Sequence, residues 1–270
     1  MNNPSSLIRS ASIALVSSIL LSWSAIAAVP SDLKPEPIHS QTIRDIVSSL
    51  NTDHYTDIVL NDELSSKVFD QYIESLDPSK AYFYAHDLAT FERYRYSLDE
   101  DIAAGDLSAA YAIFNIYQQR TIERLENLIT RLEDPAYQVD FTLDEALESD
   151  RENSTWPENT QSMNELWRKR LKSALLSLKL ADKTLPDAKE TLLKRYQSQL
   201  SRAQQTNTED VFQSYANALT QQFDPHTQYF SPRSSENFNI NMSLSLEGIG
   251  AVLQTENDNT KVVRLVPAGP

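Results

Sequence analysis

The sequence of 270 residues contains no cysteine and only four glycines. The missing cysteines exclude disulfides, thiolate nucleophiles, cysteine-based zinc sites and a lipid-anchored N-terminal cysteine. The scarcity of glycine, which averages about 7% in globular domains, disfavours glycine-rich phosphate loops and turn-rich β architectures. A mostly helical chain remains, and its 40% hydrophobic content is sufficient for a core.

Basic residues are outnumbered, with 24 Lys and Arg against 38 Asp and Glu, which gives a net charge of −14. Such a chain repels phosphate backbones, so nucleic acid is not an expected partner. Histidines are also few, and the four of them, His39, His54, His86 and His226, lie too far apart for the usual metal-ligand spacings. We therefore expect no metal site, and no residue is assigned to a cofactor.

Long apolar runs are absent apart from a short one near the start, Ile13 to Leu21, which follows Arg9. The sequence Ala25-Ile26-Ala27 comes next and fits the A-x-A pattern of a signal-peptidase site. A membrane span needs about 20 apolar residues, so a cleaved signal peptide over residues 1–27 is favoured over a retained anchor. An extended leader, residues 28–37, follows. The mature protein is expected to be secreted and to have no stable membrane span.

Helical periodicity dominates residues 38–232. The clearest helix runs from Ser108 to Leu132, between a break at Gly105 and a stop at Pro135. Further helix starts are expected at Asn61, Asp87, Thr208, at a capping box from Ser162 to Glu165, and at Pro186-Asp187. Residues 136–159 are acidic and irregular, which indicates a surface loop.

Two clusters in this helical part have both a structural and a functional interpretation. Tyr82, Phe83 and Tyr84 form either an aromatic plug between helices or a contact patch, and the plug is favoured because large aromatic residues dominate cores. The basic residues at 168–170 and 172 form either a docking face for acidic partners or a solvated face paired with nearby carboxylates. The paired face is favoured, because charge runs are usually of that kind.

After Pro232 the pattern changes. A short helix is expected from Ser235 to Met242, then strands from Ala251 to Gln254 and from Lys261 to Val266, with a turn at 257–259. Gly248 and Gly250 lie directly before the first strand. A Gly-x-Gly sequence in this position can turn backbone N–H groups toward one point, where a carboxylate can bind. Taken alone the pattern is weak, and an ordinary β-turn is the favoured explanation.

Catalytic residues are not evident. Asp224, His226 and Ser231 are the residue types of a hydrolytic triad, but they fall within eight positions of one turn-rich segment. Triads bring together separate elements of a fold, so a structural role of Asp224-Pro225 as a helix stop, with His226 at the surface between domains, is favoured. No serine adjoins a glycine, which the nucleophile elbow requires.

Three motifs occur in a characteristic order. They are Leu-Asp-Pro-Ser-Lys-Ala-Tyr-Phe at 76–83, Asn-Glu-Leu-Trp-Arg-Lys-Arg-Leu at 164–171, and Phe-Asp-Pro-His-Thr-Gln-Tyr-Phe-Ser-Pro at 223–232, followed by Ser-Leu-Glu-Gly-Ile-Gly-Ala-Val-Leu at 245–253. Together they resemble the carboxyl-terminal processing proteases of the bacterial periplasm, over essentially all of the mature chain.

The resemblance implies a mainly α fold, with a helical N-terminal domain over residues 38–232 and the incomplete beginning of a PDZ-type α/β domain over residues 233–270. It implies that Gly248, Ile249, Gly250 and Ala251 form the loop that binds a peptide carboxylate, and that Ile249, Ala251 and Leu253 line the peptide pocket.

The expected function is that of the N-terminal part of a serine endopeptidase. The resemblance implies apolar C-terminal tails of periplasmic proteins as substrates and an adaptor protein as a second partner. The family's serine–lysine pair lies beyond the PDZ domain, and no position here matches it, so no catalytic residue is assigned. A non-enzymatic periplasmic peptide-binding or adaptor module is the alternative.

Overall fold

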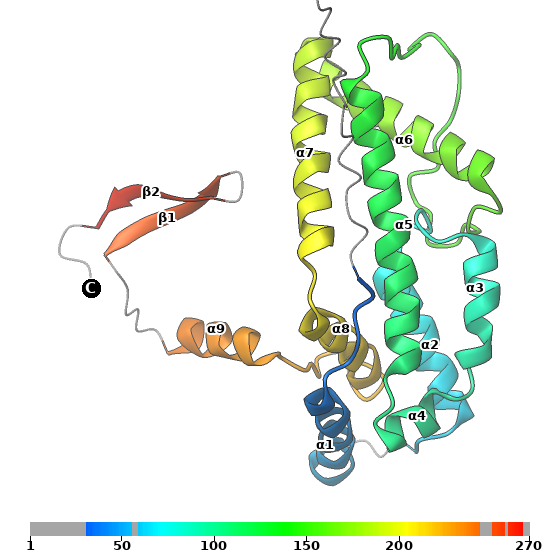
Figure 1. Ribbon diagram of the computed structural model, residues 1–270, viewed down its shortest axis with the longest axis vertical. Helices are drawn as coiled ribbons and strands as arrows, with labels where there is room; N and C mark the ends of the chain where they lie inside the picture. Colours follow the sequence, from blue (N-terminus) through cyan, green and yellow to red (C-terminus); the bar gives the residue numbers. More distant parts are fainter. Residues whose placement is uncertain (1–30, 56–58, 244–249, 257–258, 267–270) are drawn as a thin grey trace, which may run out of the picture. The chain divides into compact units, whose positions relative to one another are not determined.

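The computed structural model describes residues 31–55, 59–243, 250–256 and 259–266 of the chain (Figure 1). The predicted signal peptide lies outside these residues, and so do two of the four residues of the predicted carboxylate loop, Gly248 and Ile249. The helices are α1 (Pro37–Asp53), α2 (Asp62–Leu76), α3 (Ala85–Phe91), α4 (Leu98–Ala104), α5 (Ser108–Glu133), α6 (Thr160–Leu180), α7 (Leu185–Gln205), α8 (Thr208–Thr220) and α9 (Pro232–Met242), with a 3-10 turn at Glu92–Tyr94. The strands β1 (Ala251–Glu256) and β2 (Asn259–Leu265) follow. The predicted mainly α fold is confirmed.

One buried cluster joins α1, α2, α4 and α8 to the first half of α5. Phe69 and Tyr72 of α2 pack with Phe212 and Tyr215 of α8, and all four are at most 1% exposed. The rings of Tyr72 and Tyr215 meet edge to face at 5.2 Å. The Tyr72 hydroxyl donates to the carbonyl of Ala110 at the start of α5, so the polar end of this buried ring is satisfied.

A second buried cluster joins the other half of α5 to α6 and α7, and α7 runs beside α5 (Figure 1). Leu125 and Leu128 of α5 meet Leu171 and Leu175 of α6, and Leu192 of α7 completes the cluster. Each of these side chains is at most 1% exposed. The helix α5 therefore supplies buried side chains to both clusters, one from each half of its length.

The segment after α2 connects the two clusters. Phe83 is fully buried in the first cluster, and Ala81 is fully buried in the second. Asp77, which is 1% exposed, holds the segment in place. Its carboxylate accepts hydrogen bonds from the backbone N–H groups of Ala81, Tyr82 and Phe83 at 2.8, 3.0 and 3.1 Å, and from Trp156 Nε1 at 3.2 Å. The aromatic run is thus a plug, as predicted, with Phe83 at its centre.

Several predicted helix starts are displaced in the structure. The residue before α6 is Asn159, whose side chain accepts from Ser162 N, so the helix begins ahead of the predicted box from Ser162 to Glu165. Asn207 rather than Thr208 caps α8, and Tyr84 precedes α3. For α6 and α8 an earlier asparagine side chain accepts from a first-turn N–H group, whereas at α3 the Asp87 carboxylate accepts from the Tyr84 N–H at 3.0 Å. Local sequence alone does not rank such competing caps. The predicted cap at Asn61 and the proline start of α7 are confirmed.

The basic face of α6 is mostly paired, as predicted. Arg168 and Lys172 both contact the Glu145 carboxylate, and Arg168 also pairs with Glu165 at 2.8 Å. These contacts fasten the acidic loop at 136–159 to α6, and they hold the pKa of Glu145 near 2. Arg170 differs, because it stacks over the Trp167 ring at 4.7 Å.

In the described parts of the chain, no helix is both long and apolar enough to cross a bilayer.

Candidate peptide-binding site

Of the predicted site residues, the structure describes Gly250, Ala251 and Leu253, whereas Gly248 and Ile249 lie outside the described residues. Gly250 has a φ of 65°, in the left-handed region that glycine adopts without a steric penalty. Its carbonyl accepts a hydrogen bond of 2.7 Å from Val266 N. The glycine therefore turns the chain directly before β1. Its hydrogen bond to Val266 extends the pairing of the two strands by one residue ahead of Ala251.

The two strands form an antiparallel hairpin. Ala251 pairs with Leu265 and Val252 with Arg264, whereas Leu253 pairs with Val262, so Val263 is an extra residue in β2. Such a bulge increases the local twist of the hairpin. The predicted strands are confirmed with small shifts: β1 extends two residues further, and β2 starts at Asn259, which was predicted to belong to the turn.

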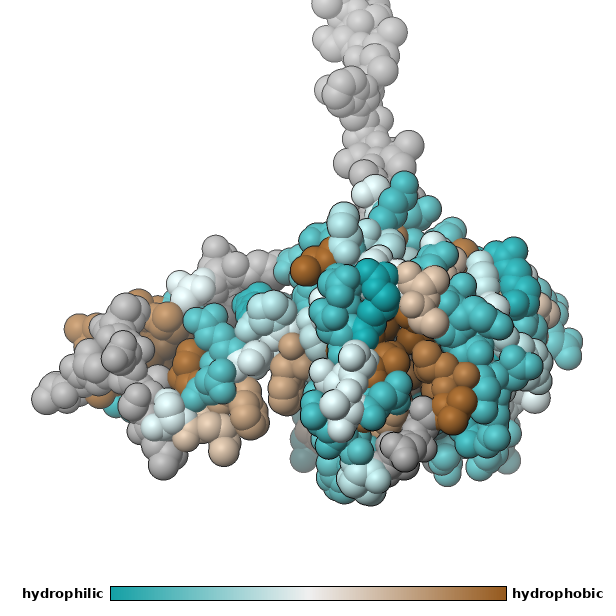
Figure 2. Space-filling model, turned by 90° about the horizontal axis from the view of Figure 1, so that it is seen from below, coloured by the Kyte–Doolittle hydropathy of each residue, from teal (hydrophilic) through white to brown (hydrophobic). Residues whose placement is uncertain are grey.

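One edge of β1 is open in the described part of the chain, because β1 pairs there with β2 alone. Ala251 and Leu253 lie on the same face of β1, since alternate residues of a strand share a face. The part of the chain from α9 onward carries exposed apolar side chains (Figure 2). These are Phe238, Ile240, Met242, Leu253, Val262, Val263, Leu265 and Val266. An open strand edge beside exposed apolar side chains can accept an extended peptide as an additional strand.

The rejected triad is not assembled by the fold. Asp224 and His226 do contact one another, with Nδ1 at 3.1 Å from Oδ1, but the His226 side chain is 93% exposed. Ser231 is 6% exposed and caps α9, where its Oγ lies 2.8 Å from Ser234 Oγ. Among the described residues no hydrogen bond joins Ser231 to His226. The cap formed by Ser231 is a structural role that the sequence analysis did not assign.

One group of carboxylates could approach a cation. Asp62, Asp99 and Glu100 offer oxygens within 4.8 Å of one another, and Asp99 Oδ1 is buried without a hydrogen-bond partner in the described structure. A protein-bound Ca²⁺ takes six to eight oxygen ligands, and Mg²⁺ requires octahedral geometry. Three carboxylates from two helix starts fall short of either set, so we assign no metal here.

Sequence reasoning missed a cavity of about 570 Å³ between α5 and the start of α6. It is lined by Tyr84, His86, Arg120, Glu123, Arg124, Asn127, Glu158, Asn159, Thr160 and Asn164. A partial signal was present, because Arg120 and Arg124 are four residues apart and so share a face of the long helix. That Arg124 is buried depends on α6, which no pattern within α5 reveals.

Comparisons with known proteins agree with the motifs. A family model described as the tail specific protease N-terminal domain matches residues 46–233. A tail-specific protease from Haemophilus influenzae is 37% identical over 252 residues, which cover 90% of this chain. The same match covers 36% of the relative, so the chain spans about a third of that protein's length.

Proposed function

Because the chain belongs to the tail-specific protease family, whose N-terminal domain it contains, we propose that it is the N-terminal part of a secreted serine endopeptidase. In this proposal the enzyme recognises periplasmic proteins by their apolar C-terminal tails and degrades them. No residue of this chain is assigned to bond cleavage. The helical part, α1 to α8, serves as a scaffold that contributes to a substrate vault and docks an adaptor protein.

The open edge of β1 directly after Gly250 is the observation that supports tail recognition. A tail that pairs with this edge gains backbone hydrogen bonds whatever its sequence, which suits an enzyme with many substrates. The N–H groups of Ile249, Gly250 and Ala251 receive the terminal carboxylate. Ile249 and Ala251 then contact the last side chain, and Leu253 contacts the next one that faces the same way.

Replacing Gly250 with valine should weaken binding of a peptide that ends in a free apolar carboxylate. The φ of 65° is unfavourable for a β-branched residue, so the turn that aims the N–H groups changes. Hydrogen bonds to a charged group contribute about 1.5–3 kcal/mol, so we expect the Kd to rise roughly tenfold to hundredfold. Isothermal titration with the full-length protein measures this change.

The same peptide with an amidated terminus is the matched control, and it should bind wild type as weakly as the free acid binds Gly250→Val. Equal titration curves for the free and amidated peptides would exclude carboxylate capture at this turn. Circular dichroism of the variant at 222 nm should be unchanged, because the helices lie outside the substituted turn.

Export should remove residues 1–27. Small residues at Ala25 and Ala27 fit the signal-peptidase pattern, and the preceding apolar run is too short to remain as a membrane span. N-terminal sequencing of the protein purified from the periplasm should therefore begin at Ala28 or Val29. A periplasmic protein that begins at Met1 would contradict the proposed cleavage, and Ala27→Leu should retain the unprocessed form.

A further inference from the structure

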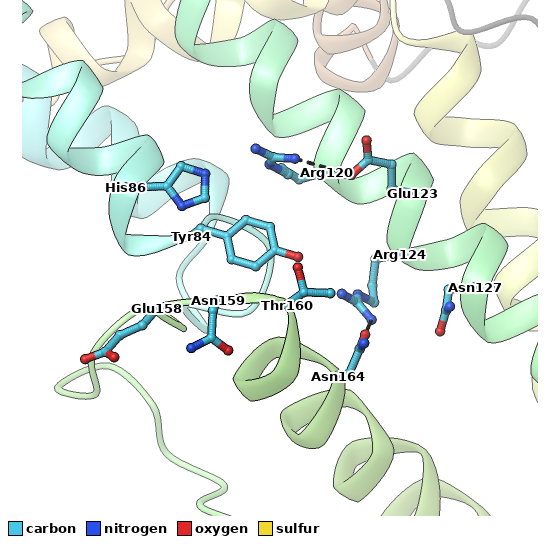
Figure 3. A pocket seen from close by; sticks show the side chains of 10 residues that line it. All are labelled: Tyr84, His86, Arg120, Glu123, Arg124, Asn127, Glu158, Asn159, Thr160 and Asn164. Carbon is cyan, nitrogen blue, oxygen red and sulfur yellow. Dashed lines mark hydrogen bonds and ion pairs between the residues drawn. The ribbon is translucent and has the colours of Figure 1, made fainter.

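The cavity between α5 and α6 brings side chains of three elements together around Tyr84 (Figure 3). Arg120, Arg124 and Asn127 reach it from α5, and Asn159, Thr160 and Asn164 reach it from the start of α6. Arg120 lies over the Tyr84 ring with 4.9 Å to the centroid, and His86 stacks on the same ring at 5.2 Å. Apart from Glu123 and Glu158, each side chain that lines the cavity has a group that can donate a hydrogen bond.

Arg124 differs from Arg120 in its partners. Arg120 donates to both oxygens of the Asp87 carboxylate at 2.9 and 3.1 Å and lies 3.4 Å from Glu123. Arg124 is 8% exposed, and Nη1 donates to the amide oxygen of Asn164 at 2.9 Å. Among the described residues no carboxylate forms an ion pair with it, and burial lowers the pKa of its guanidinium.

An arginine that is buried without a carboxylate is costly, because the desolvated charge is not compensated. Its guanidinium donates to the Asn164 amide oxygen and is hydrogen-bonded to the Tyr84 side chain, and these two neutral partners leave some of its five N–H groups for a ligand. The cavity beside it is large enough for a ligand to reach the remaining donors. An anion that entered the cavity would therefore find free guanidinium donors.

The start of α6 adds to this positive environment. Its 21 residues begin at Thr160 on the wall of the cavity, and the N-terminus of a helix carries partial positive charge. Asn127 and Asn159 offer further amide donors. Of the two acidic residues on the wall, Glu123 is held by Arg120, and Figure 3 shows the Glu158 carboxylate turned away from Arg124.

We propose that this cavity binds a carboxylate group through Arg124, supported by the amide side chains and the first turn of α6. One uncompensated cation matches the single charge of a carboxylate, and a flat guanidinium binds a carboxylate through two parallel hydrogen bonds. A phosphate dianion fits less well, because Glu123 and Glu158 remain on the wall. The site is separate from the strand edge proposed for the tails, so either can be tested without the other.

The test is titration of the full chain, followed by the Nε–Hε NMR signal of Arg124, which is assigned by its loss in Arg124→Met. The probe is an acetylated and amidated Ala-Glu-Ala peptide, and Ala-Gln-Ala is its uncharged match. We expect the glutamate peptide to shift the Arg124 signal and the glutamine peptide to leave it unchanged. Arg124→Met should raise the Kd for the glutamate peptide at least about tenfold.

Two further variants separate binding from folding. Arg131→Gln removes a cation from the same helix outside the cavity, and it should bind the glutamate peptide as wild type does. Arg124→Lys keeps the charge but loses the flat fork, so its affinity should fall between those of wild type and Arg124→Met.

A titration with sodium acetate at the same ionic strength distinguishes a carboxylate on a protein segment from a small free acid. Tighter binding of the glutamate peptide than of acetate would assign the site to a protein segment, and equal binding would assign it to small free acids. Both results support a carboxylate site. Equal shifts with the glutamine peptide, phosphate binding as tight as the glutamate peptide, or unchanged affinity in Arg124→Met would each overturn the proposal.

Discussion

Replacing Asp77 with alanine should lower the free energy of unfolding by about 4 kcal/mol. The carboxylate is 1% exposed and accepts from three consecutive backbone N–H groups and from Trp156 Nε1. Alanine leaves all four donors buried without their acceptor, and each such donor costs about 1–3 kcal/mol with incomplete additivity. Urea unfolding followed by circular dichroism measures the change.

Asp70→Ala is the matched control, because Asp70 lies on α2, the helix that ends directly before Asp77, and pairs with Arg95 at 2.8 Å while its side chain is 65% exposed. Exposed ion pairs contribute about 0–1 kcal/mol, so this variant should unfold close to wild type. Asp77→Asn should lie between the two, since its amide keeps one acceptor and turns a donor toward the remaining N–H groups. Similar losses in Asp77→Ala and Asp70→Ala would contradict an anchoring role for Asp77.

Replacing Phe83 with alanine should cost about 3–5 kcal/mol, as expected for a large aromatic side chain removed from a packed core. Phe83 is fully buried, and its ring meets those of Phe91 at 5.5 Å and Tyr117 at 5.7 Å. The cavity left by alanine lies where the segment after α2 enters the first buried cluster. The same urea experiment reports the loss as a lower midpoint with an unchanged slope.

Phe230→Ala provides the control for this variant, because Phe230 is 41% exposed and its loss should cost roughly 0.5 kcal/mol. Phe83→Leu should recover most of the stability, since leucine refills part of the cavity. If Phe83→Ala unfolds at the same urea concentration as wild type, the aromatic run is a surface patch rather than the plug that the structure shows.

The long helices were predictable because their signals are local. Gly105 and Pro135 mark the two boundaries of α5 in the sequence, so the prediction was close. The observed helix, Ser108–Glu133, ends only one residue after the predicted end. Helix starts were less predictable where two polar residues compete for one cap, as Asn159 and Ser162 do. The strand pair was recognisable from its alternating apolar residues, but the bulge at Val263 depends on pairing across the hairpin.

The candidate sites also differ in whether local sequence could predict them. Gly250 could be placed from the sequence because a glycine before an apolar strand marks a turn, and its φ of 65° agrees. The cavity around Arg124 could not be placed, because its partner Asn164 is 40 residues away on another helix. Asp77 was equally unpredictable as an anchor, because an Asp-Pro pair at a helix end normally indicates only a stop.

The helix α5 couples the two buried clusters mechanically, because it contributes side chains to both. At about 1.5 Å per residue its 26 residues span roughly 39 Å, with Phe114 held in one buried cluster and Leu128 in the other. A continuous rod fixed at both ends couples the opening of each cluster to the opening of the other, so the two behave as one cooperative unit. Arg124 lies between those anchors, and an occupant of its cavity would therefore brace both halves of the helical part at once.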